Sequence, residues 1–484
     1  MKNVLLLIIV TSLMPCVSYS REPSQPPAIP TEENPEVLTS GPMHEAFAEP
    51  VDLNIQPGII VPAQPPANIK ETLPAEKPSG QFVWVPGYWA WDSQRNSYIW
   101  VSGCWRTAPP NMYWVPGYWL KISDGWQWVS GFWAPTSGIG RIEYLPEPPE
   151  LVDIKPPVIT VSSDKIWVPP CWYWRNGKYI LRSGYWVTAQ PDWIWEPSHY
   201  VWTPRGYVFV AGHWDYVLSK RGVLFAPVYF PGRVYERPDF SYSLSIVIDI
   251  GNLNFGLFAY PHYRHYYFGD YYDDVYLSIG ILPWFESRSR YVWYDPIYEH
   301  QHWRYSRGEP QWEKHHRDDY ERRRADRSLR PARTYREMEA RVEKMPFIKQ
   351  TEYWTAAPLK TVITEKRDQI RFEPMSNDSR QRISRKTTDV RDFGIERKQW
   401  ESEKPIQKES KEMSPPARAN VPERVKTTSP PISDKQGIFD IFRKGPPSRP
   451  ANEKRTEAGG KQSQPEPGNN SDTPRQENRR DRRG

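Results

Sequence analysis

One six-residue pattern recurs eight times between residues 84 and 214, and it constrains the fold more than any other feature of the chain. Its clearest copy is Trp84-Val85-Pro86-Gly87-Tyr88-Trp89, with an indole at each end and glycine at the fourth position. The copies begin at residues 84, 100, 114, 128, 167, 181, 195 and 209, and most neighbours are 14 residues apart. Two sets of four, over 84–133 and 167–214, indicate an internal duplication of a small structural unit.

The copies alternate between two types, which predicts that they pair. The third position holds proline in the odd copies and serine or alanine in the even copies. Turn-forming stretches join the members of a pair, and Asn176-Gly177 is the strongest hairpin signal among them. Proline cannot donate to a strand ladder, so the odd copies are expected at sheet edges. The sequence therefore predicts an all-β domain over residues 81–230, built of tandem tryptophan-rich β-hairpin repeats in small twisted sheets.

Glycine at the fourth position predicts a bulge in each strand. In a regular strand the first and sixth residues point to opposite faces, because the side-chain period is two. A β-bulge adds one residue and brings both rings to the same face. We therefore expect bulges near Gly87, Gly103, Gly117, Gly131 and Gly184. The rings expected to form the repeat core are Trp84, Trp89, Trp100, Trp105, Trp114, Trp119, Trp128, Trp133, Trp167, Trp172, Trp186 and Trp214.

Five further tryptophans lie outside the two ring positions of the pattern, and we expect them to be exposed. They are Trp91, Trp126, Trp174, Trp193 and Trp202. Exposed rings can form a surface that stacks on sugars or receives proline-rich segments. The alternative is that all rings of the repeats belong to the core, because each buried ring supplies a large apolar area.

Two cysteines occupy the same position in two copies of the pattern. Cys104 and Cys171 each precede the sixth residue. In an oxidising compartment such a pair can form a disulfide, provided that the fold brings the two Cα atoms close enough. The alternative is two buried thiols that act as small apolar side chains.

The pattern resembles the WXXGXW (or YXWGXW) repeat family of exported bacterial envelope proteins. The resemblance covers residues 82–214. It implies an exported protein or a lipoprotein, and it brings no activity with it. The sequence departs from the family pattern at Pro170, which replaces glycine, at Leu181, which replaces tryptophan, and over the copy at 195–200. These departures predict less regular ring stacking in the second set of copies.

The N-terminus predicts export. Lys2 precedes an apolar run, Val4–Met14, and small residues follow at Ser18 and Ser20. This is the order of a secretory signal peptide over residues 1–20. The run of 11 apolar residues is too short to span a bilayer. A lipoprotein signal ending at Cys16 is less favoured, because the two residues before the cysteine are not small.

The segments on either side of the repeats are expected to be disordered. Residues 21–80 contain 13 prolines and no tryptophan, which predicts a Pro-rich spacer. Residues 346–484 are polar and charged, which predicts a disordered basic tail. Residues 301–484 hold 43 basic and 30 acidic residues, a net charge of +13. Such a tail suits an anionic polymer as partner, and the alternative is a tail that is only solvated.

Two ordered regions are expected between the repeats and the tail. Residues 231–300 are rich in aromatic residues and alternate in polarity, which predicts a β-rich cap on the repeats. Residues 301–345 are charged and favour helix. A capping box at Thr334 and Glu337 predicts a short helix over residues 335–345.

The cap contains polar clusters, but none of them marks a catalytic or metal site. One acidic turn holds Asp270, Asp273 and Asp274. Its spacing matches no Ca²⁺-binding loop, so a solvated turn is favoured over a Ca²⁺ site. The histidines of this region are His262, His265, His300 and His302. We expect surface histidines, since no zinc-type ligand pattern accompanies them. No cofactor is expected.

These features predict an exported, non-enzymatic cell-envelope protein that acts as a scaffold or interaction module through its aromatic hairpins. Its partners would be other envelope proteins or a polysaccharide, in the periplasm or at the cell surface. One alternative is a carbohydrate- or peptidoglycan-binding protein that uses exposed Trp and Tyr faces. A second alternative is an enzyme with its site in residues 231–300.

Overall fold

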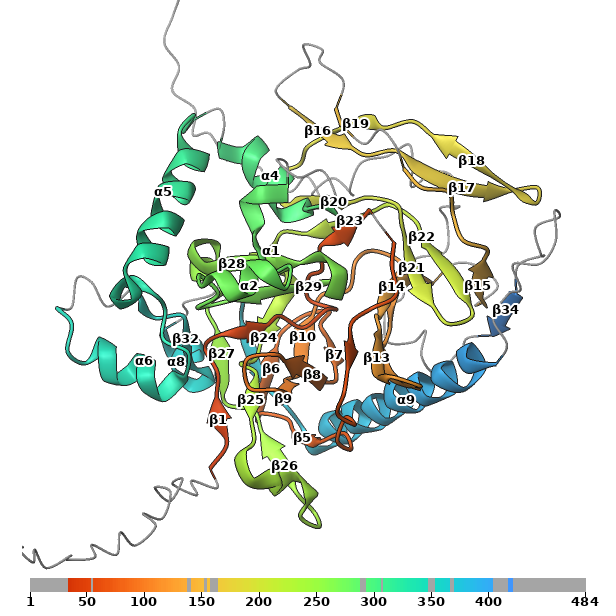
Figure 1. The fold of residues 1–484 in the computed structure, drawn as a ribbon. Coiled ribbons are helices and arrows are strands. Elements are labelled where there is room, and N and C mark those ends of the chain that lie inside the picture. The colour runs from red at the N-terminus through yellow and green to blue at the C-terminus, as the bar shows by residue number, and fades with distance from the viewer. Residues whose placement is uncertain are drawn as a thin grey trace, which may run out of the picture. The chain divides into compact units, whose positions relative to one another are not determined.

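The computed structural model describes residues 34–53, 55–136, 141–151, 155–156, 164–287, 293–305, 308–346, 353–365, 370–403 and 417–420. All of them belong to one structural unit, residues 1–435. Up to residue 294 they form short strands in small, mostly antiparallel sheets, and most of the helices follow (Figure 1). The predicted all-β class therefore describes the repeats and the cap but not the last part. The predicted signal peptide and the end of the predicted tail lie outside the described residues.

Each odd copy of the pattern pairs with the even copy that follows it, so the eight copies form four hairpins. Within each hairpin the two outer strands pair with each other, and so do the two inner strands. Hairpin 1 consists of β7 (Val83–Val85), β8 (Tyr88–Asp92), β9 (Ser97–Val101) and β10 (Cys104–Arg106). Hairpin 2 consists of β11 (Met112–Val115), β12 (Tyr118–Ile122), β13 (Gly125–Val129) and β14 (Phe132–Pro135). Hairpin 3 consists of β16 (Lys165–Val168), β17 (Cys171–Arg175), β18 (Lys178–Arg182) and β19 (Tyr185–Thr188). Hairpin 4 consists of β20 (Trp193–Glu196), β21 (His199–Thr203), β22 (Gly206–Val210) and β23 (His213–Tyr216).

The predicted bulges are absent from these hairpins, which are interrupted on both strands at the same place. In hairpin 1, Val85 pairs with Cys104 and Tyr88 pairs with Val101, so two residues on one strand oppose two on the other. A bulge would oppose two residues to one. The prediction is therefore wrong at Gly87, Gly103, Gly117, Gly131 and Gly184, and each hairpin is divided into two separate ladders instead.

The interruption lets the two rings of one copy contact the two rings of its partner. In hairpin 1 the ring centroids of Trp84 and Trp105 lie 5.2 Å apart, and those of Trp89 and Trp100 also lie 5.2 Å apart. Both pairs meet edge to face, the geometry that aromatic rings prefer. The corresponding pairs elsewhere are Trp114–Trp133, Trp119–Trp128, Trp167–Trp186 and Trp195–Trp214.

The fourth-position glycine is required by close packing, since none of these glycines has a positive φ. A Cβ atom on Gly103 would lie 2.3 Å from the ring of Trp84, the first residue of the partner copy. A Cβ atom on Gly184 would lie 2.2 Å from the ring of Trp167 in the same way. The first tryptophan of each copy therefore packs directly on the glycine of the copy opposite.

The departures from the pattern fall on these packing partners. Pro170 replaces a glycine, and the partner copy has Leu181 in place of its first tryptophan. Ser198 also replaces a glycine, and there the partner copy has Phe209. A larger residue at the fourth position thus accompanies a smaller one at the facing first position, which keeps the total volume similar.

Residues 34–53 and 55–80, which we call the N-terminal thread, lie in the core of the unit in their first part and are mostly half-buried or exposed after residue 54. Leu38, Met43 and Phe47 are fully buried. Its strands are β1 (Glu36–Val37), β2 (Gly41–Pro42), β3 (Val51–Asp52), β4 (Ile60–Val61), β5 (Lys70–Thr72) and β6 (Glu76–Pro78). Each pairs at an edge with a strand that comes later in the chain. The predicted disordered spacer is therefore wrong for the described residues, because edge strands of two or three residues need few backbone donors and tolerate proline.

Short strands and 3₁₀ turns follow hairpin 4 and continue through the cap, residues 231–300. Before the cap lie β24 (Gly222–Leu224) and β25 (Val228–Tyr229), and in the cap lie β26 (Ser241–Ser243), β27 (Ile246–Ile248), β28 (Leu257–Tyr260), β29 (His265–Phe268), β30 (Leu282–Pro283) and β31 (Trp293–Tyr294). Two short helices, α1 (Leu218–Arg221) and α2 (Asp274–Ser278), lie among them. β24 and β25 pair with β10 and β9, so residues 222–229 add a third arm to hairpin 1.

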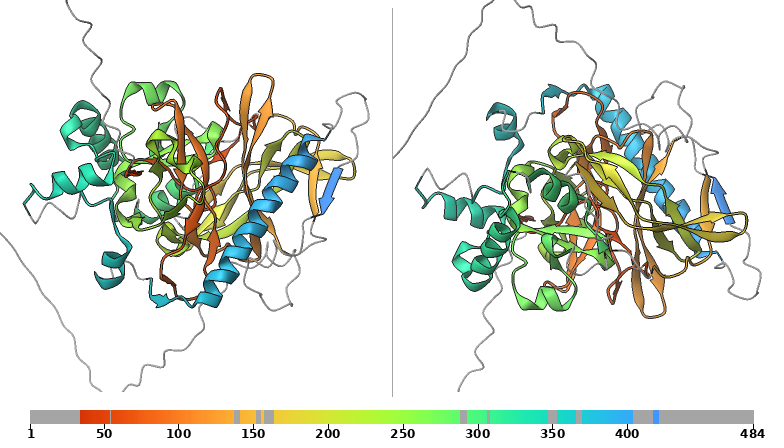
Figure 2. Two further views of the ribbon diagram at one scale, coloured as in Figure 1. Left: turned by 90° about the horizontal axis from the view of Figure 1, so that it is seen from below. Right: turned by 90° about the horizontal axis from the view of Figure 1, so that it is seen from above.

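Helices dominate the residues after the cap. They are α4 (Pro296–Tyr305), α5 (Trp312–Ala325), α6 (Tyr335–Val342), α8 (Leu359–Glu365) and α9 (Asn377–Ser402). The predicted short helix is present as α6, and the side chain of Thr334 accepts a hydrogen bond from the amide of Glu337 at its start. The 26-residue helix α9 contradicts the predicted disordered tail, and it packs against β7 and β12 (Figure 2).

Four more strands complete the described part: β15 (Arg141–Leu145), β32 (Ala356–Pro358), β33 (Phe372–Pro374) and β34 (Ala417–Asn420), the last of which pairs with β15. β32 pairs with β27 of the cap, and β33 pairs with β6 of the N-terminal thread. Within the described ranges, no helix is long and apolar enough to cross a membrane.

Candidate functional site

Hairpin 1 encloses the carboxylate of Glu71, which comes from β5. The amide of Gly103 donates to its Oε1 (2.7 Å), the amide of Gly87 donates to its Oε2 (3.2 Å), and Nε1 of Trp100 donates to Oε1 (2.9 Å). The two amides are available because they lie at the interruption, between the two ladders. Burial raises the pKa of Glu71 even though these bonds and nearby Arg391 oppose it. We call this set of two glycine amides and one indole the glutamate socket.

Glu45, also from the N-terminal thread, occupies the corresponding place in hairpin 2 but makes fewer bonds. The amide of Gly131 donates to its Oε1 at 3.1 Å. Trp128 stands where Trp100 stands in hairpin 1, yet its Nε1 has no hydrogen-bond partner among the described residues. The Oε2 atom of Glu45 also has no partner among them. The socket of hairpin 2 therefore leaves two buried polar atoms unpaired.

The other two hairpins hold no glutamate from the N-terminal thread in their sockets. In hairpin 4, Ser198 replaces the first glycine, and its Oγ accepts a hydrogen bond from the amide of Gly212 (2.8 Å). In hairpin 3, Pro170 has no N–H and Leu181 has no indole. Hairpin 3 has thus lost two of the three socket donors and keeps only the amide of Gly184.

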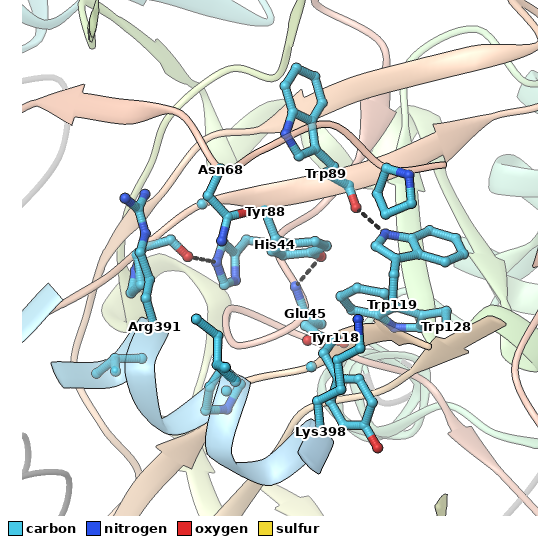
Figure 3. A pocket seen from close by; sticks show the side chains of 18 of the residues that line it. His44, Glu45, Asn68, Tyr88, Trp89, Tyr118, Trp119, Trp128, Arg391 and Lys398 are labelled. Carbon is cyan, nitrogen blue, oxygen red and sulfur yellow. Dashed lines mark hydrogen bonds between the residues drawn. The ribbon is translucent and has the colours of Figure 1, made fainter. Parts of the chain in front are cut away.

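A cavity of about 200 Å³ lies between hairpin 1, hairpin 2 and α9 (Figure 3), and we call it the hairpin 1–2 pocket. Its buried lining is mostly aromatic and includes Glu45 and Trp128. Its more exposed lining comes from the N-terminal thread and from α9, with Asn68, Arg391 and Lys398. The pocket therefore joins an aromatic interior and a polar rim.

Ionisable groups inside the pocket and at its rim have shifted pKa values. Burial raises the pKa of Glu45 to about 8, and the nearby carboxylate of Glu49 adds to this while Arg397 and Arg264 oppose it. Glu45 is therefore mostly protonated at neutral pH. Burial lowers the pKa of both Arg391 and Lys398 at the rim. Arg391 donates to the carbonyl oxygen of Ile69 at 2.8 Å and interacts with the charge of Glu71, while Nζ of Lys398 lies over the ring of Trp126.

Helix α9 is fastened to hairpin 2 by a buried ion pair. The guanidinium of Arg397 lies 2.8 Å from the carboxylate of Glu401, and both side chains are fully buried. Arg397 also donates to the carbonyl oxygens of Pro116 (2.8 Å) and Ser130 (3.0 Å), which belong to the interruption of hairpin 2. The hydroxyl of Tyr118 donates to Glu401 at 2.6 Å. This helix therefore closes one side of the pocket at a fixed position.

A family model described as the WXXGXW repeat matches residues 82–106 and 191–214. The chain carries WXXGXW repeats. The two matched segments correspond to hairpin 1 and hairpin 4 of the structure. No curated protein and no solved structure matches the chain.

The predicted core rings of the WXXGXW hairpins differ between the two sets of copies. In the first set all eight are buried: Trp84, Trp89, Trp100, Trp105, Trp114, Trp119, Trp128 and Trp133. In the second set four are only half-buried: Trp167, Trp172, Trp186 and Trp214. The first set therefore lies inside the unit, and the second lies at its surface.

The five tryptophans predicted to be exposed do not form one surface. Trp91 is 7% exposed and packs edge-on against Tyr98, so the prediction is wrong there. The other four are half-buried and lie on four different strands: Trp126, Trp174, Trp193 and Trp202. Among them Trp126 is the one covered by Lys398, whose Nζ lies 5.2 Å from the ring centroid. A binding role for these rings stays a prediction.

The predicted disulfide is not formed. Cys104 and Cys171 are both free and buried, and they belong to different apolar clusters. Cys104 packs in the main core, while Cys171 packs beside Tyr200 and Leu145. Burial raises the pKa of Cys171 to about 12, so its thiol is unreactive at neutral pH. Cys16 lies outside the described residues.

The polar clusters of the cap have structural partners. Asp270 and Asp273 pair with Arg330 at 3.5 and 2.8 Å, and Asp274 pairs with Arg324 at 2.6 Å. The acidic turn thus binds arginines of the charged helical segment. Within the described ranges, no group of three His, Cys, Asp or Glu side chains could hold a metal ion.

The expectation of surface histidines is wrong for two of the four cap histidines. His265 is fully buried, and its Nε2 lies 2.6 Å from the hydroxyl of Tyr88. His300 is also buried, and its Nε2 lies 3.0 Å from the carbonyl oxygen of Gln190. Desolvation lowers the pKa of His265 to about 3 and of His300 to about 4.

Sequence reasoning missed Glu45, Glu71, Arg397 and Lys398, which define the sockets and the pocket. None of them belongs to a repeat, and each lies in a segment predicted to be disordered. One sequence signal could have indicated the sockets, namely the Pro-Gly and Ser-Gly dipeptides of hairpins 1 and 2. Each dipeptide leaves the amide of its glycine outside the strand ladders. Buried amides require an acceptor, and the repeats themselves offer few.

Proposed function

We propose that this protein is an exported, non-enzymatic cell-envelope component whose WXXGXW hairpins act as interaction modules. The proposal is supported first by the glutamate sockets of hairpins 1 and 2. Each socket binds one glutamate of the N-terminal thread, Glu71 on the short strand β5 and Glu45 in a turn. A hairpin of this kind is suited to hold a glutamate side chain of another segment, whether that segment comes from the same chain or from another protein. The signal-like N-terminus supports export.

The observation that carries the proposal is the exposure of hairpin 3. Ile180 and Leu181 on β18 are 44% and 46% exposed, among the few exposed large apolar side chains of the described residues. They lie on the two-stranded sheet β17–β18, to which no third strand is added within the described part (Figure 1). An apolar hairpin with free edges is a favourable surface for a partner strand. We therefore assign hairpin 3 as the contact surface.

The test is capture of envelope components by the full chain and by Ile180→Ser/Leu181→Ser. We expect the wild-type chain to retain a specific set of components at about 0.5 M salt, where exposed charges are screened. The double variant should lose them, because it removes only exposed apolar area. Val275→Ser on α2 is the matched control, since Val275 is 60% exposed and lies away from the repeats in sequence. Equal capture by all three proteins would contradict the proposal.

Binding of a saccharide is the second candidate function. It is favoured by the hairpin 1–2 pocket, where an aromatic lining is joined by the polar side chains of Asn68, Arg391 and Lys398 at the rim. Pockets for small ligands commonly combine a mostly apolar lining with a few placed polar groups. This candidate differs from the first, because it uses the buried first set of copies and not hairpin 3.

A further inference from the structure

We propose that the free edge of β18 in hairpin 3 binds an extended acidic segment of another polypeptide, in which two apolar residues are followed by proline. This inference rests on the proposed function, which assigns hairpin 3 as the contact surface, and it specifies how the partner binds there. Three features of the molecule support it: the edge that the other hairpins use, the short sequence that they bind, and the charge of hairpin 3.

The other three hairpins each bind a third strand at the same edge. In each case the second inner strand receives it: β9 pairs with β25, β13 pairs with β4, and β22 pairs with β15, all antiparallel. The equivalent strand of hairpin 3 is β18, and β17 is its sole partner in the described part of the chain (Figure 1). An open edge offers backbone donors and acceptors to an extended chain. Hairpin 3 therefore presents an edge that is occupied in every other hairpin.

The burial of one equivalent residue shows what the third strand covers. Ile99, Gln127 and Val208 directly precede the even copy in hairpins 1, 2 and 4, and they are 1%, 7% and 5% exposed. Gln127 and Val208 pair directly with the third strand. The equivalent residue of hairpin 3 is Ile180, which is 44% exposed. A strand added to β18 would thus cover an apolar side chain that water now reaches.

The three bound segments share a short sequence, two apolar residues followed by proline. In hairpins 2 and 4 the first apolar residue pairs with Gln127 and with Val208, respectively. In hairpin 1 the pairing of Val228 with Trp100 places the first apolar residue at the same position. Proline at the third place ends the pairing, because it has no N–H. The three segments are Ile60-Val61-Pro62, Tyr144-Leu145-Pro146 and Tyr229-Phe230-Pro231.

Hairpin 3 differs from the other hairpins in charge, which indicates an acidic partner. Residues 165–188 hold four basic residues and no acidic one, whereas the net charge of each other hairpin lies between −1 and +1. Lys178 and Arg182 lie on β18 itself and are both exposed. Acidic residues on either side of the apolar pair would lie close to these two cations. A second copy of hairpin 3 is disfavoured, since its own cations would be repelled.

A lipid surface is a less suitable occupant than a strand. The edge of β18 keeps backbone donors and acceptors that are costly to place in hydrocarbon. Ile180 and Leu181 are neighbours on one strand, so their side chains point to opposite faces of the hairpin. A flat surface could cover one of these two side chains, whereas a strand added at the edge lies beside both.

The experiment is titration of the full chain with a fluorescein-labelled peptide, Ser-Asp-Ile-Ile-Val-Pro-Glu-Ser, followed by fluorescence anisotropy. The peptide keeps residues 59–62 of this chain and adds an acidic residue on each side. The control peptide, Ser-Asp-Ile-Pro-Ile-Val-Glu-Ser, has the same composition with proline in the centre. We expect saturable binding of the first peptide, about tenfold tighter than the control, which lacks a central donor. No saturable binding by the folded protein, or equal affinity for the two peptides, would overturn the proposal.

Protein variants place the binding at β18. Ile180→Ser should weaken the peptide by about fivefold or more, whereas Ile180→Val keeps the apolar contact and should change it by less than about twofold. Lys178→Gln should weaken it by about twofold to fivefold. Lys165→Gln is the matched control, because Lys165 is also exposed but lies on β16, in the other ladder of the hairpin. Equal effects of the two lysine variants, or no effect of Ile180→Ser, would overturn the assignment to this edge.

Hydrogen exchange and the oligomeric state test the same site without the variants' affinities. Bound peptide should slow amide exchange in residues 178–182, because strand addition pairs their backbone. Unchanged exchange there at saturating peptide would overturn the proposal. A dimer in solution that Ile180→Ser abolishes would also overturn it, because a second copy would then occupy the edge. The melting temperature of each variant separates loss of binding from loss of structure.

The capture test on hairpin 3 has a separate outcome. If Ile180→Ser/Leu181→Ser abolishes capture and the peptide does not bind, hairpin 3 remains the contact surface and strand addition at β18 is overturned. If the peptide binds and capture is the same for all proteins, the strand site remains and the proposed function is overturned.

Discussion

The two sets of WXXGXW copies fold into the same hairpins, yet they are covered differently. Hairpins 1 and 2 each bind a glutamate of the N-terminal thread and pack against helix α9 on one side. Strands β24 and β25 add a third arm to hairpin 1. Hairpins 3 and 4 keep several half-buried rings, and hairpin 3 has exposed apolar side chains. The repeat therefore builds the hairpin, while segments outside the repeat decide whether that hairpin becomes core or surface.

The largest effect is expected when the packing of helix α9 on hairpin 2 is disrupted. Arg397→Met removes the partner of Glu401 and leaves a fully buried carboxylate without its cation. Removal of one member of a buried pair costs about 3–5 kcal/mol, so the free energy of unfolding should fall by about that amount. Chemical denaturation measures it, with Arg385→Met on the exposed face as control. A loss below about 1 kcal/mol would show that α9 contributes little to covering hairpin 2.

The next prediction concerns the packing of the first tryptophan of a copy on the glycine of the copy opposite, and it compares the two sets of copies. Gly131→Ala would place a Cβ atom 2.3 Å from the buried ring of Trp114, and it should destabilise the protein by about 1–3 kcal/mol. Gly184→Ala faces the half-buried ring of Trp167, which has room to move, so its cost should be smaller. Denaturation of the two variants side by side measures the difference. Equal costs would mean that exposure of the ring does not matter.

A double variant sharpens the same comparison. Trp128→Phe together with Gly117→Ser copies the Phe209 and Ser198 combination of hairpin 4 at the equivalent positions of hairpin 2. We expect its cost to be smaller than the sum of the two single costs by about 0.5–3 kcal/mol, because the smaller ring makes room for the added side chain. Additive costs would contradict the idea that the two positions compensate each other.

Buried carboxyl groups should make the protein less stable as the pH rises above about 6.5. The pKa values of Glu45 and Glu196 are raised to about 8 by burial. Between the ordinary value of 4.5 and 8 the folded state binds more protons than the unfolded state at these groups, so their contribution to stability falls as pH rises. His44 and His265 have pKa values lowered to about 4 and 3, and their opposite contribution offsets that of the carboxyls below pH 6.5, so the fall is expected above it.

The pH series is measured by denaturation of the wild type and of Glu45→Gln. Each raised carboxyl contributes a slope of roughly 1 kcal/mol per pH unit between pH 6.5 and 8. The variant should lose the contribution of one carboxyl, roughly 1 kcal/mol per pH unit, from the slope above pH 6.5. An unchanged slope above pH 6.5 would mean that Glu45 is ionised in the folded protein.

The smallest effect is expected in hairpin 3. Pro170→Gly together with Leu181→Trp restores the pattern and all three socket donors. Pro170 is buried, but Leu181 is 46% exposed and an indole there would lack the cover that the first set has, so the free energy of unfolding should change by no more than about 0.5–1 kcal/mol. Denaturation measures it against the equivalent change at a buried hairpin. A large gain in stability would show that hairpin 3 is limited by its sequence and not by the absence of cover.

The parts of the fold that were predicted correctly are those whose signals are local. Alternation of proline and serine in the third position predicted the pairing of copies, and Thr334 with Glu337 predicted α6. The N-terminal thread carries no hydrophobic period, because its strands of two or three residues are held by pairing with distant strands. Helix α9 depends on Arg397 and Glu401, which count as polar in any sequence pattern. The sockets and the pocket were missed for the same reason.

The pairing of the N-terminal thread determines when the fold can be completed. Lys77 on β6 contacts Glu373 on β33, and the two residues are 296 positions apart in the chain. A chain that leaves the ribosome or a translocation channel from its N-terminus delivers the thread first and its last partner much later. Contacts of such long separation slow folding, because a large loop must close before they form. The protein is therefore expected to stay incompletely folded during synthesis. An incompletely folded chain fits through a narrow channel, and its aromatic rings need protection until folding is complete.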